Sequence, residues 1–279
     1  MKNILTFDVE DWYHPHLIPR DTRKQVRLQS RVVEPTLRIL RMLADSGNQA
    51  TFFVLGCIAE AFPDLVRRIQ KEGHEVASHG YGHHIVHTQN RHEFIADLQK
   101  SKSVLTCILK EPVVGYRAPS WSLNDQTHWV LEELYKNGFR YDSSHFPFET
   151  FLYGSNAIPR FMHRVKLDSD RFIAELPPSV IQVYRRRLPF CGGFYFRLLP
   201  YWFVRFAVHW INRRDREPAL LYLHPWELDP NQPRLLKKWP DRFIQYHRLE
   251  TTERKLHHLL KDFRFVSIRR LLTEKGWMD

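Results

Sequence analysis

The segment Ile4-Leu5-Thr6-Phe7-Asp8-Val9-Glu10-Asp11 joins a short apolar run to three carboxylates that follow it directly. The apolar run at 4–7 predicts a buried β-strand. Residues two apart along an extended segment point the same way, so Asp8 and Glu10 are expected on one side of the chain. We therefore expect a polar site where this first strand ends.

Apolar runs and helical patterns alternate along the rest of the chain. Further strands are predicted at 51–54, 74–77, 113–116, 219–223 and 263–267. Helices are predicted at 32–43, 63–71, 91–109, 127–136, 253–260 and 268–274. This alternation is typical of parallel strands with helices outside, either as an open α/β sheet or as a (β/α) barrel. Residues 145–215 show no clear pattern, and we expect a less regular insertion there.

The composition indicates a folded protein with a preference for anionic partners. Hydrophobic residues make up 43% and charged residues 26% of the 279, which excludes a disordered chain. The formal net charge of +11 favours phosphate-bearing lipids, an anionic membrane face or nucleic acid. No zinc finger, basic repeat or RNA-binding motif is found, so we expect no nucleic-acid partner.

Three widely spaced cysteines, Cys57, Cys107 and Cys191, form neither a zinc-binding pair nor a disulfide framework. No apolar stretch is long enough for the core of a signal peptide or for a transmembrane helix. We therefore expect a cytoplasmic protein. Peripheral contact with the inner membrane is compatible with this location.

Two histidines follow the strand predicted at 74–77, in Ser78-His79-Gly80-Tyr81-Gly82-His83. Imidazoles at i and i+4 can share a cation, which then needs at least one further ligand, normally a carboxylate. The acids at 8–11 are candidates for that ligand. The alternatives are a run of loop histidines, and helix capping or a solvated loop for the acids.

Arg117 and His224 also follow predicted strands, and the carboxyl edge of a parallel sheet is where active sites are built. Arg117 could orient a catalytic carboxylate or form a purely structural ion pair. His224 could be a general acid or a satisfied core histidine. Serine-hydrolase, phosphate-loop, dinucleotide-binding and H-E-x-x-H protease motifs are not found in the sequence.

Together, these segments resemble the polysaccharide deacetylase family, which is carbohydrate esterase family four and shares the nodulation-type deacetylase homology domain. Five motifs carry the resemblance: Thr6-Phe7-Asp8, Ser78-His79 through His83, Arg117-Ala118-Pro119, Tyr141-Asp142-Ser143-Ser144 and Leu223-His224. Asp-Val-Glu-Asp-Trp at 8–12, Phe-Cys-Gly-Gly at 190–193 and Phe-Arg-Phe-Val at 263–266 are similar to a bacterial subgroup found with exopolysaccharide and surface-glycan gene clusters.

The resemblance implies a single catalytic domain over 1–279, with a subgroup-specific part from about 145, folded as a distorted and often incomplete (β/α) barrel. It implies a metal-dependent hydrolase that removes an N-acetyl group from an amino sugar in a polysaccharide or a lipid-linked glycan precursor. The metal would be divalent, zinc first, with cobalt or nickel as alternatives. A deformylase or amidase on a related amide, and an inactive glycan-binding homologue, remain open.

The resemblance also assigns roles to residues. Asp8 would be the general base, Arg117 its anchor, and His224 the acid that protonates the leaving amine, with Asp142 tuning His224. The backbone N–H near Ser120 or Trp121 could stabilise the oxyanion.

The acid that joins His79 and His83 at the metal is less clear, because the family usually has two adjacent aspartates where this chain has Asp8-Val9-Glu10-Asp11. Related subgroups of the family place the ligand two positions after the base, which favours Glu10, and alternation along the strand supports this choice; Asp11 is the alternative.

Aromatic residues near the motifs are candidates to stack on sugar rings, with core packing as the alternative for each. The aromatic candidates are Trp12, Tyr13, Trp121 and Trp226, and Ser120, which precedes Trp121, is a further substrate-binding candidate. A helix is predicted at 200–212, and one broad face of it carries aromatic residues. Arginines flank this helix within the region 185–216. It could cover the barrel core with a basic rim, or it could contact an anionic membrane.

Overall fold

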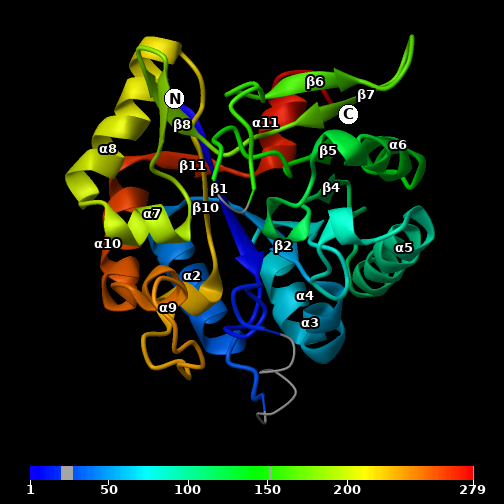
Figure 1. Cartoon of the computed structure of the whole chain (residues 1–279). Helices are drawn as coiled ribbons and strands as arrows, with labels where there is room; N and C mark the ends of the chain where they lie inside the picture. Colours follow the sequence, from blue (N-terminus) through cyan, green and yellow to red (C-terminus); the bar gives the residue numbers. More distant parts are fainter. Residues whose placement is uncertain (20–27, 151–152, 279) are drawn as a thin grey trace.

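The computed structural model describes residues 1–19, 28–150 and 153–278 (Figure 1). Its centre is strand β1 (Lys2–Val9), which pairs with β10 (Leu220–Leu223) on one edge and with β2 (Thr51–Val54) and β11 (Arg264–Val266) on the other. From β2 the sheet continues through β3 (Glu75–Ser78), β4 (Gly115–Tyr116), β5 (Tyr141–Asp142), β7 (Phe172–Glu175) and β6 (His163–Lys166). Within the described strands of this sheet, every pairing is parallel except that of β6 with β7.

The sheet curls into an incomplete barrel. Its two end strands are β10 and β6, and these two strands do not pair with each other. Near the opening, the Ser179 N–H donates a backbone hydrogen bond to the Leu220 C=O over 3.0 Å. The incomplete (β/α) barrel expected from the sequence is therefore confirmed.

Helices surround this sheet, and their bounds lie close to the predicted ones, except that the short helix at 56–61 was not predicted. They are α2 (Val33–Ser46), α3 (Gly56–Ala61), α4 (Pro63–Lys71), α5 (Arg91–Ile108), α6 (Trp129–Lys136), α10 (Thr252–Asp262) and α11 (Ile268–Glu274). Helix α2 ends at Gly47, whose φ of 63° is the left-handed value that glycine adopts without strain. Among the described residues, no helix has both the length and the apolar character needed to cross a membrane.

Residues 145–215 are more regular than the sequence pattern indicated. Besides β6 and β7, this region forms the hairpin β8 (Val180–Val183) and β9 (Arg186–Pro189), then α7 (Gly193–Leu198) and α8 (Tyr201–Trp210). Helix α8 lies within the helix predicted at 200–212, whereas α9 (Asp241–Tyr246) was not predicted. Each of these four strands has four residues, and β6 alternates half-buried and exposed positions in the segment HRVK. Such a pattern is too short and too polar to be recognised without its pairing partner.

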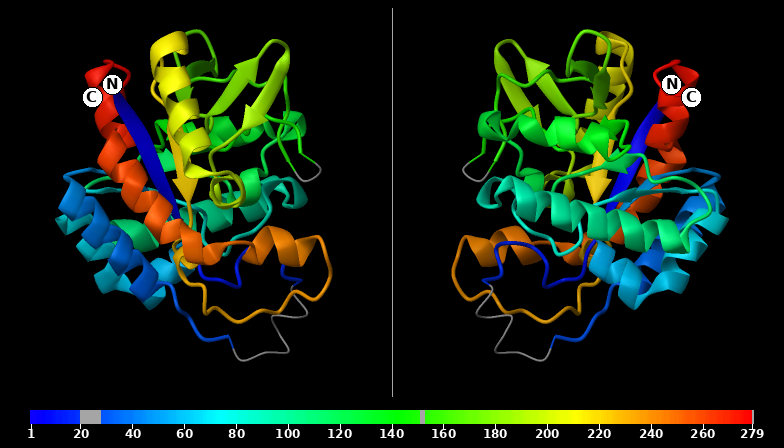
Figure 2. Two further views of the ribbon diagram at one scale, coloured as in Figure 1. Left: turned by 90° about the vertical axis from the view of Figure 1, so that its left-hand side faces the viewer. Right: turned by 90° about the vertical axis from the view of Figure 1, so that its right-hand side faces the viewer.

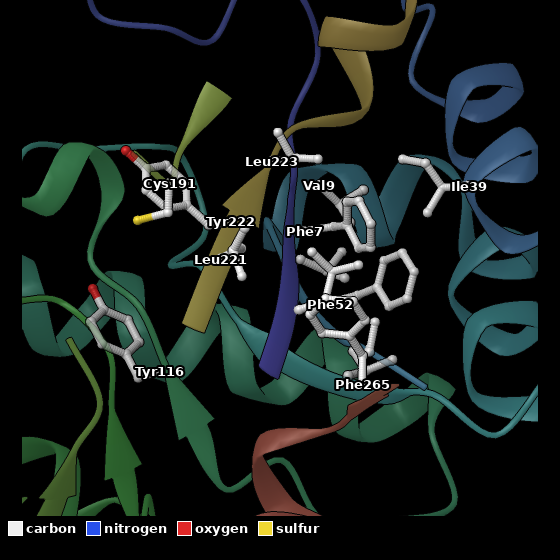
Figure 3. Close-up of a cluster of buried hydrophobic side chains, with 14 of the residues drawn as sticks. Phe7, Val9, Ile39, Phe52, Tyr116, Cys191, Leu221, Tyr222, Leu223 and Phe265 are labelled. Atoms are coloured by element: carbon white, nitrogen blue, oxygen red, sulfur yellow. The ribbon is translucent and has the colours of Figure 1, made fainter. Parts of the chain in front are cut away.

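The two faces of β1 have different roles. Leu5, Phe7 and Val9 point toward the surrounding helices and are completely buried. Phe7 stacks on Phe52 with ring centroids 5.1 Å apart, and Figure 3 shows this cluster between the sheet and the helix that carries Ile39. The opposite face of β1 directs polar side chains into the barrel, where the candidate site lies.

Removal of the Phe52 ring tests this packing. We expect Phe52→Ala to lower the free energy of unfolding by about 3–5 kcal/mol, because the buried ring leaves a cavity beside Phe7. Trp202→Ala is the control, since that side chain is 68% exposed, and its effect should stay within about 0.5 kcal/mol. Urea unfolding measures both, and equal losses would contradict the assigned core.

Candidate active site

Glu10, His79 and His83 bring three potential ligand atoms together where β1 and β3 end. Nε2 of His79 and Nε2 of His83 lie 3.0 Å and 3.1 Å from the same atom, Oε1 of Glu10. All three side chains are buried. The two predicted histidines and the acid two residues after Asp8 therefore form one cluster.

This donor set fits a divalent cation. Two ligands at zinc-type bond lengths in a tetrahedron are roughly 3.3 Å apart, close to the separations in the cluster. His79 Nδ1 lies 2.8 Å from the Arg117 C=O, to which it can only donate a proton. With Nδ1 bonded in this way, Nε2 of His79 faces Glu10 and His83, as a cation shared by the three side chains would require.

The ionisation of Glu10 agrees with this interpretation. Burial by itself raises the pKa of Glu10, but the charge of His83 and the hydrogen bonds from His79 and His83 outweigh it. The pKa therefore lies well below its ordinary value. Metal binding needs the deprotonated carboxylate that these surroundings favour.

Asp11 lies outside this cluster and holds the chain instead. Its carboxylate accepts hydrogen bonds from the Ser30 hydroxyl and, over 2.9 Å, from the Arg31 N–H. Of the two candidate acid ligands, Glu10 is thus the one that the structure brings to the histidines.

Asp8 is held by Arg117, as the sequence predicted for an anchored carboxylate. Nη1 of Arg117 lies 2.6 Å from Oδ1 of Asp8 and 2.9 Å from the Thr6 hydroxyl. The other guanidinium nitrogens donate to the C=O and the hydroxyl of Ser143 over 3.1 Å and 2.8 Å. With Oδ1 occupied, the second oxygen of Asp8 faces His224, whose Nε2 lies 3.9 Å away.

His224 is oriented by a carboxylate that the sequence analysis missed. Nδ1 of His224 lies 2.7 Å from Oε1 of Glu227, and Nε of the buried Arg197 donates to Oε2 of Glu227 over 2.8 Å. Burial lowers the pKa of His224, but the bond to Glu227 and the nearby charges of Glu10 and Asp8 raise it to about 9. The signal that could have revealed Glu227 is its position three residues after His224, across the proline of the short helix Pro225–Leu228.

Asp142, predicted to tune His224, has different neighbours. Its Oδ1 accepts a 2.5 Å hydrogen bond from the Ser144 hydroxyl, and that hydroxyl accepts the Ala118 N–H over 2.8 Å. Burial and the adjacent Glu175 raise the pKa of Asp142 well above its ordinary value. Asp142 therefore supports the loop after Arg117, and the structure gives the position beside His224 to Glu227.

A cavity opens onto this cluster, and the substrate-binding candidates divide around it. Ser120, Trp121 and Trp226 line the cavity together with Glu10, His83 and His224. Trp12 is fully buried and donates its Nε1–H to the Gln29 C=O, and neither it nor Tyr13 lines the cavity. Further lining residues that were not predicted are His16, Tyr153, Phe194 and Gln245.

The loop after Arg117 has an unusual backbone where it meets the cavity. Ser120 and Trp121 have φ values of 56° and 54°, in the left-handed region that side chains with a Cβ rarely adopt. Such conformations persist where surrounding contacts hold them, and they are frequent at functional sites.

Comparison with known proteins agrees with these motifs. Residues 5–140 match the family model described as polysaccharide deacetylase, and residues 143–273 match a domain of unknown function, DUF3473. A peptidoglycan-N-acetylglucosamine deacetylase of Bacillus cereus is 33% identical over 102 residues, 36% of this chain and 37% of that protein. A peptidoglycan deacetylase of Helicobacter pylori is 34% identical over 109 residues, 38% of this chain and 36% of that protein. The chain thus matches little more than a third of the length of either relative.

The fold of the whole chain has a counterpart among solved structures. A candidate polysaccharide deacetylase from Mycobacterium smegmatis gives a TM-score of 0.64 at 22% identity, over 99% of this chain and 91% of that one. At this identity, the likeness concerns the fold alone.

Measurement of the metal content tests whether Glu10 or Asp11 is the acid ligand. We expect near-stoichiometric zinc, cobalt or nickel in the reconstituted wild type, and its loss in His79→Ala/His83→Ala and in Glu10→Gln, because each removes converging ligand atoms. Asp11→Asn should keep the metal, as should the control His257→Ala/His258→Ala on the exposed side of α10. Elemental analysis after gel filtration gives the stoichiometry. An empty wild type, or loss in Asp11→Asn alone, would contradict the assigned ligands.

The proton on His224 gives a second test. In metal-free protein the imidazole should titrate near pH 9, and the Glu227→Gln substitution should move this pKa down toward about 6.5, because it removes the charge beside Nδ1. The protonated form, which a general acid requires, would then be lost at lower pH. Asp142→Asn should leave the titration unchanged. NMR of the histidine side chains measures all three, and an equal shift in Asp142→Asn would restore Asp142 as the tuning residue.

Proposed function

We propose that this chain, whose residues 5–140 belong to the polysaccharide deacetylase family, is a metal-dependent hydrolase that removes an N-acetyl group from an amino sugar in a glycan. One observation carries the proposal: Glu10, His83 and His224 line one cavity, and Asp8, anchored by Arg117, lies directly behind them beside Glu10 and His224. Amide hydrolysis needs a base, an electrophile and an acid in such proximity.

Glu10, His79 and His83 are the residues that would hold the metal. A divalent cation bound by them supplies a Lewis acid to the amide carbonyl. Zinc suits the two imidazoles and one carboxylate, and cobalt or nickel are compatible with the same donors.

Asp8 would take the proton from the attacking water. The Arg117 guanidinium occupies Oδ1 and so fixes the carboxylate, whose Oδ2 lies 3.9 Å from Nε2 of His224. Because Arg117 is completely buried and has four hydrogen bonds, Asp8 has little freedom to rotate. A fixed base lowers the entropic cost of the proton transfer.

His224 would give a proton to the nitrogen of the departing amine. Its pKa near 9 keeps it protonated at neutral pH, and the contact with Glu227 orients Nε2 toward Asp8 and the cavity. Asp8 and His224 are thus suited to opposite proton transfers on the two sides of one carbonyl. The backbone N–H of Ser120, in its left-handed conformation, is the candidate donor to the oxyanion, since the Trp121 N–H donates to the Ala118 C=O over 3.3 Å.

The proposed substrate is an N-acetylated amino sugar in a polysaccharide or in a lipid-linked glycan precursor. Two kinds of observation support an amino sugar: relatives named as peptidoglycan deacetylases, and the indole rings of Trp121 and Trp226 on the cavity wall. Aromatic faces suit the apolar face of a pyranose, while the nearby hydroxyl of Ser120 can bind a sugar hydroxyl.

Acetate release tests the reaction. Metal-loaded wild type should release acetate from N-acetylglucosamine oligomers or peptidoglycan fragments, and Asp8→Asn should lower kcat by about a hundredfold or more while it keeps the metal. His224→Ala should lose activity on the alkaline as well as the neutral side of the pH profile, since the donor is gone. The matched control is His257→Ala, which lies outside the cavity.

The competing functions give different results in the same assay. Release of formate from N-formyl analogues with no acetate would favour a deformylase. Glycan binding with bound metal and no hydrolysis of any amide would favour an inactive homologue, and would refute the roles given to Asp8 and His224.

A further inference from the structure

Helix α8 and the turn between β8 and β9 form an exposed surface, which we call the aromatic–arginine face. Its aromatic residues are Tyr184, Trp202, Phe206 and Trp210, and its basic residues are Arg185, Arg186, Arg205, Arg213 and Arg214. In the left view of Figure 2, α8 stands at the front of the molecule, and no other element covers it.

The aromatic side chains form one continuous row along α8. Ring centroids lie 5.8 Å apart for Trp202 and Phe203, 6.3 Å for Phe203 and Phe206, and 5.5 Å for Phe206 and Trp210. Trp202 is nevertheless 68% exposed and Phe206 45% exposed. The opposite side of α8 buries Val204, Ala207 and Val208, so the helix is apolar on its outer side as well as its inner side.

The β8–β9 turn extends this row. A groove lined by Val183, Tyr184, Trp210 and Arg214 joins the turn to the end of α8, and Tyr184 is 95% exposed. The guanidinium of Arg214 lies over the Trp210 ring, 4.5 Å from its centroid. Elements that are distant in sequence therefore contribute to one surface.

The charge of this face is positive, since the carboxylate of Asp215 in the groove is paired with Arg160 at 2.9 Å. In the described part of the chain, no carboxylate lies within salt-bridge distance of Arg185, Arg186, Arg213 or Arg214, whereas Arg205 pairs with Asp262 at 3.0 Å. Exposed arginines that flank exposed aromatic rings favour an anionic interface with apolar depth. A second copy of the chain in a symmetric dimer would set these arginines against one another, which is unfavourable.

We propose that the aromatic–arginine face docks the protein on an anionic lipid surface. Trp202 and Phe206 enter the headgroup region, and the arginines of the β8–β9 turn and of the end of α8 bind lipid phosphates. Indole and phenyl rings prefer this boundary, where one side is apolar and the other wet. The inference does not depend on the deacetylase activity.

The docking surface and the cavity lie on different parts of the barrel. Helix α7, which precedes α8 in the chain, contributes Gly193, Phe194 and Arg197 to the cavity wall (Figure 1). The far end of α8, with Arg213 and Arg214, lies instead at the start of β1, where the Asn212 side chain donates to the Asn3 side chain over 2.8 Å. Asp8 and Glu10 lie at the other end of that strand, so the docking surface leaves the cavity open.

Vesicle flotation tests the proposal. At low ionic strength the wild type should float with vesicles of equimolar phosphatidylcholine and phosphatidylglycerol and remain unbound with phosphatidylcholine alone. Trp202→Ser/Phe206→Ser and Arg213→Glu/Arg214→Glu should each lower the bound fraction about tenfold or more, and added salt should weaken wild-type binding.

Two controls match these changes elsewhere on the surface. Lys237→Glu/Lys238→Glu gives the same change in charge, and Trp239→Ser removes a tryptophan that is 77% exposed. Both should float like the wild type. Urea unfolding should show that all variants are folded, and acetate release from a soluble oligomer should be unchanged in Trp202→Ser/Phe206→Ser.

Three results would overturn the proposal. The first is an absence of wild-type flotation on the anionic vesicles at low ionic strength. The second is an equal loss of flotation in the control variants. The third is evidence that the face has another occupant. Such evidence would be sedimentation that shows a dimer, dissociated by Trp202→Ser/Phe206→Ser, or oligonucleotide binding in place of vesicle binding.

Discussion

The contact between the Arg117 guanidinium and the Asp8 carboxylate determines much of this structure. Burying a charge is costly unless it is paired and its remaining protons are hydrogen-bonded, and Arg117 meets that condition with Thr6, Asp8 and Ser143. Its plane also lies 4.1 Å from the Phe53 ring centroid. These partners come from β1, from β2 and from the segment after β5, so one side chain fixes three neighbouring parts of the barrel and orients the candidate base.

The barrel interior is divided along its axis by this contact. Toward the start of β1, Ile4, Phe53 and Ala77 form an apolar cluster with Tyr141. Toward the end of β1 lie the carboxylates and imidazoles of the candidate site. The strict alternation of β1 produces both layers, since Leu5, Phe7 and Val9 pack outward while the residues between them point inward. A one-residue shift of β1 would exchange the base for a buried valine or phenylalanine.

Local sequence was sufficient for the regular elements and for the polar groups that follow strands. Helix α4, strand β2 and the pair His79 and His83 are recognisable because the relevant residues are neighbours in the chain. Glu10 was favoured by the spacing in related subgroups of the family and by the alternation of the strand. The partners of His224 did not, since Arg197 reaches Glu227 from 30 residues away and only the folded chain brings them together. The four-residue strands β6 to β9 were missed for the same reason: their stability comes from pairing and not from their own composition.

The residues of the candidate site come from both of the segments that match family models. Asp8, Glu10, His79, His83 and Arg117 all lie within residues 5–140, whereas His224, Glu227 and Arg197 lie within residues 143–273. Strand β1, however, pairs with β10 on one edge and with β11 on part of the other, and both belong to the second segment. An isolated first segment would therefore expose one complete edge of its central strand, which is a template for intermolecular pairing. The two segments therefore depend on each other both for the candidate site and for the sheet, and any recombination of this chain with a relative would have to carry β1, β10 and β11 together.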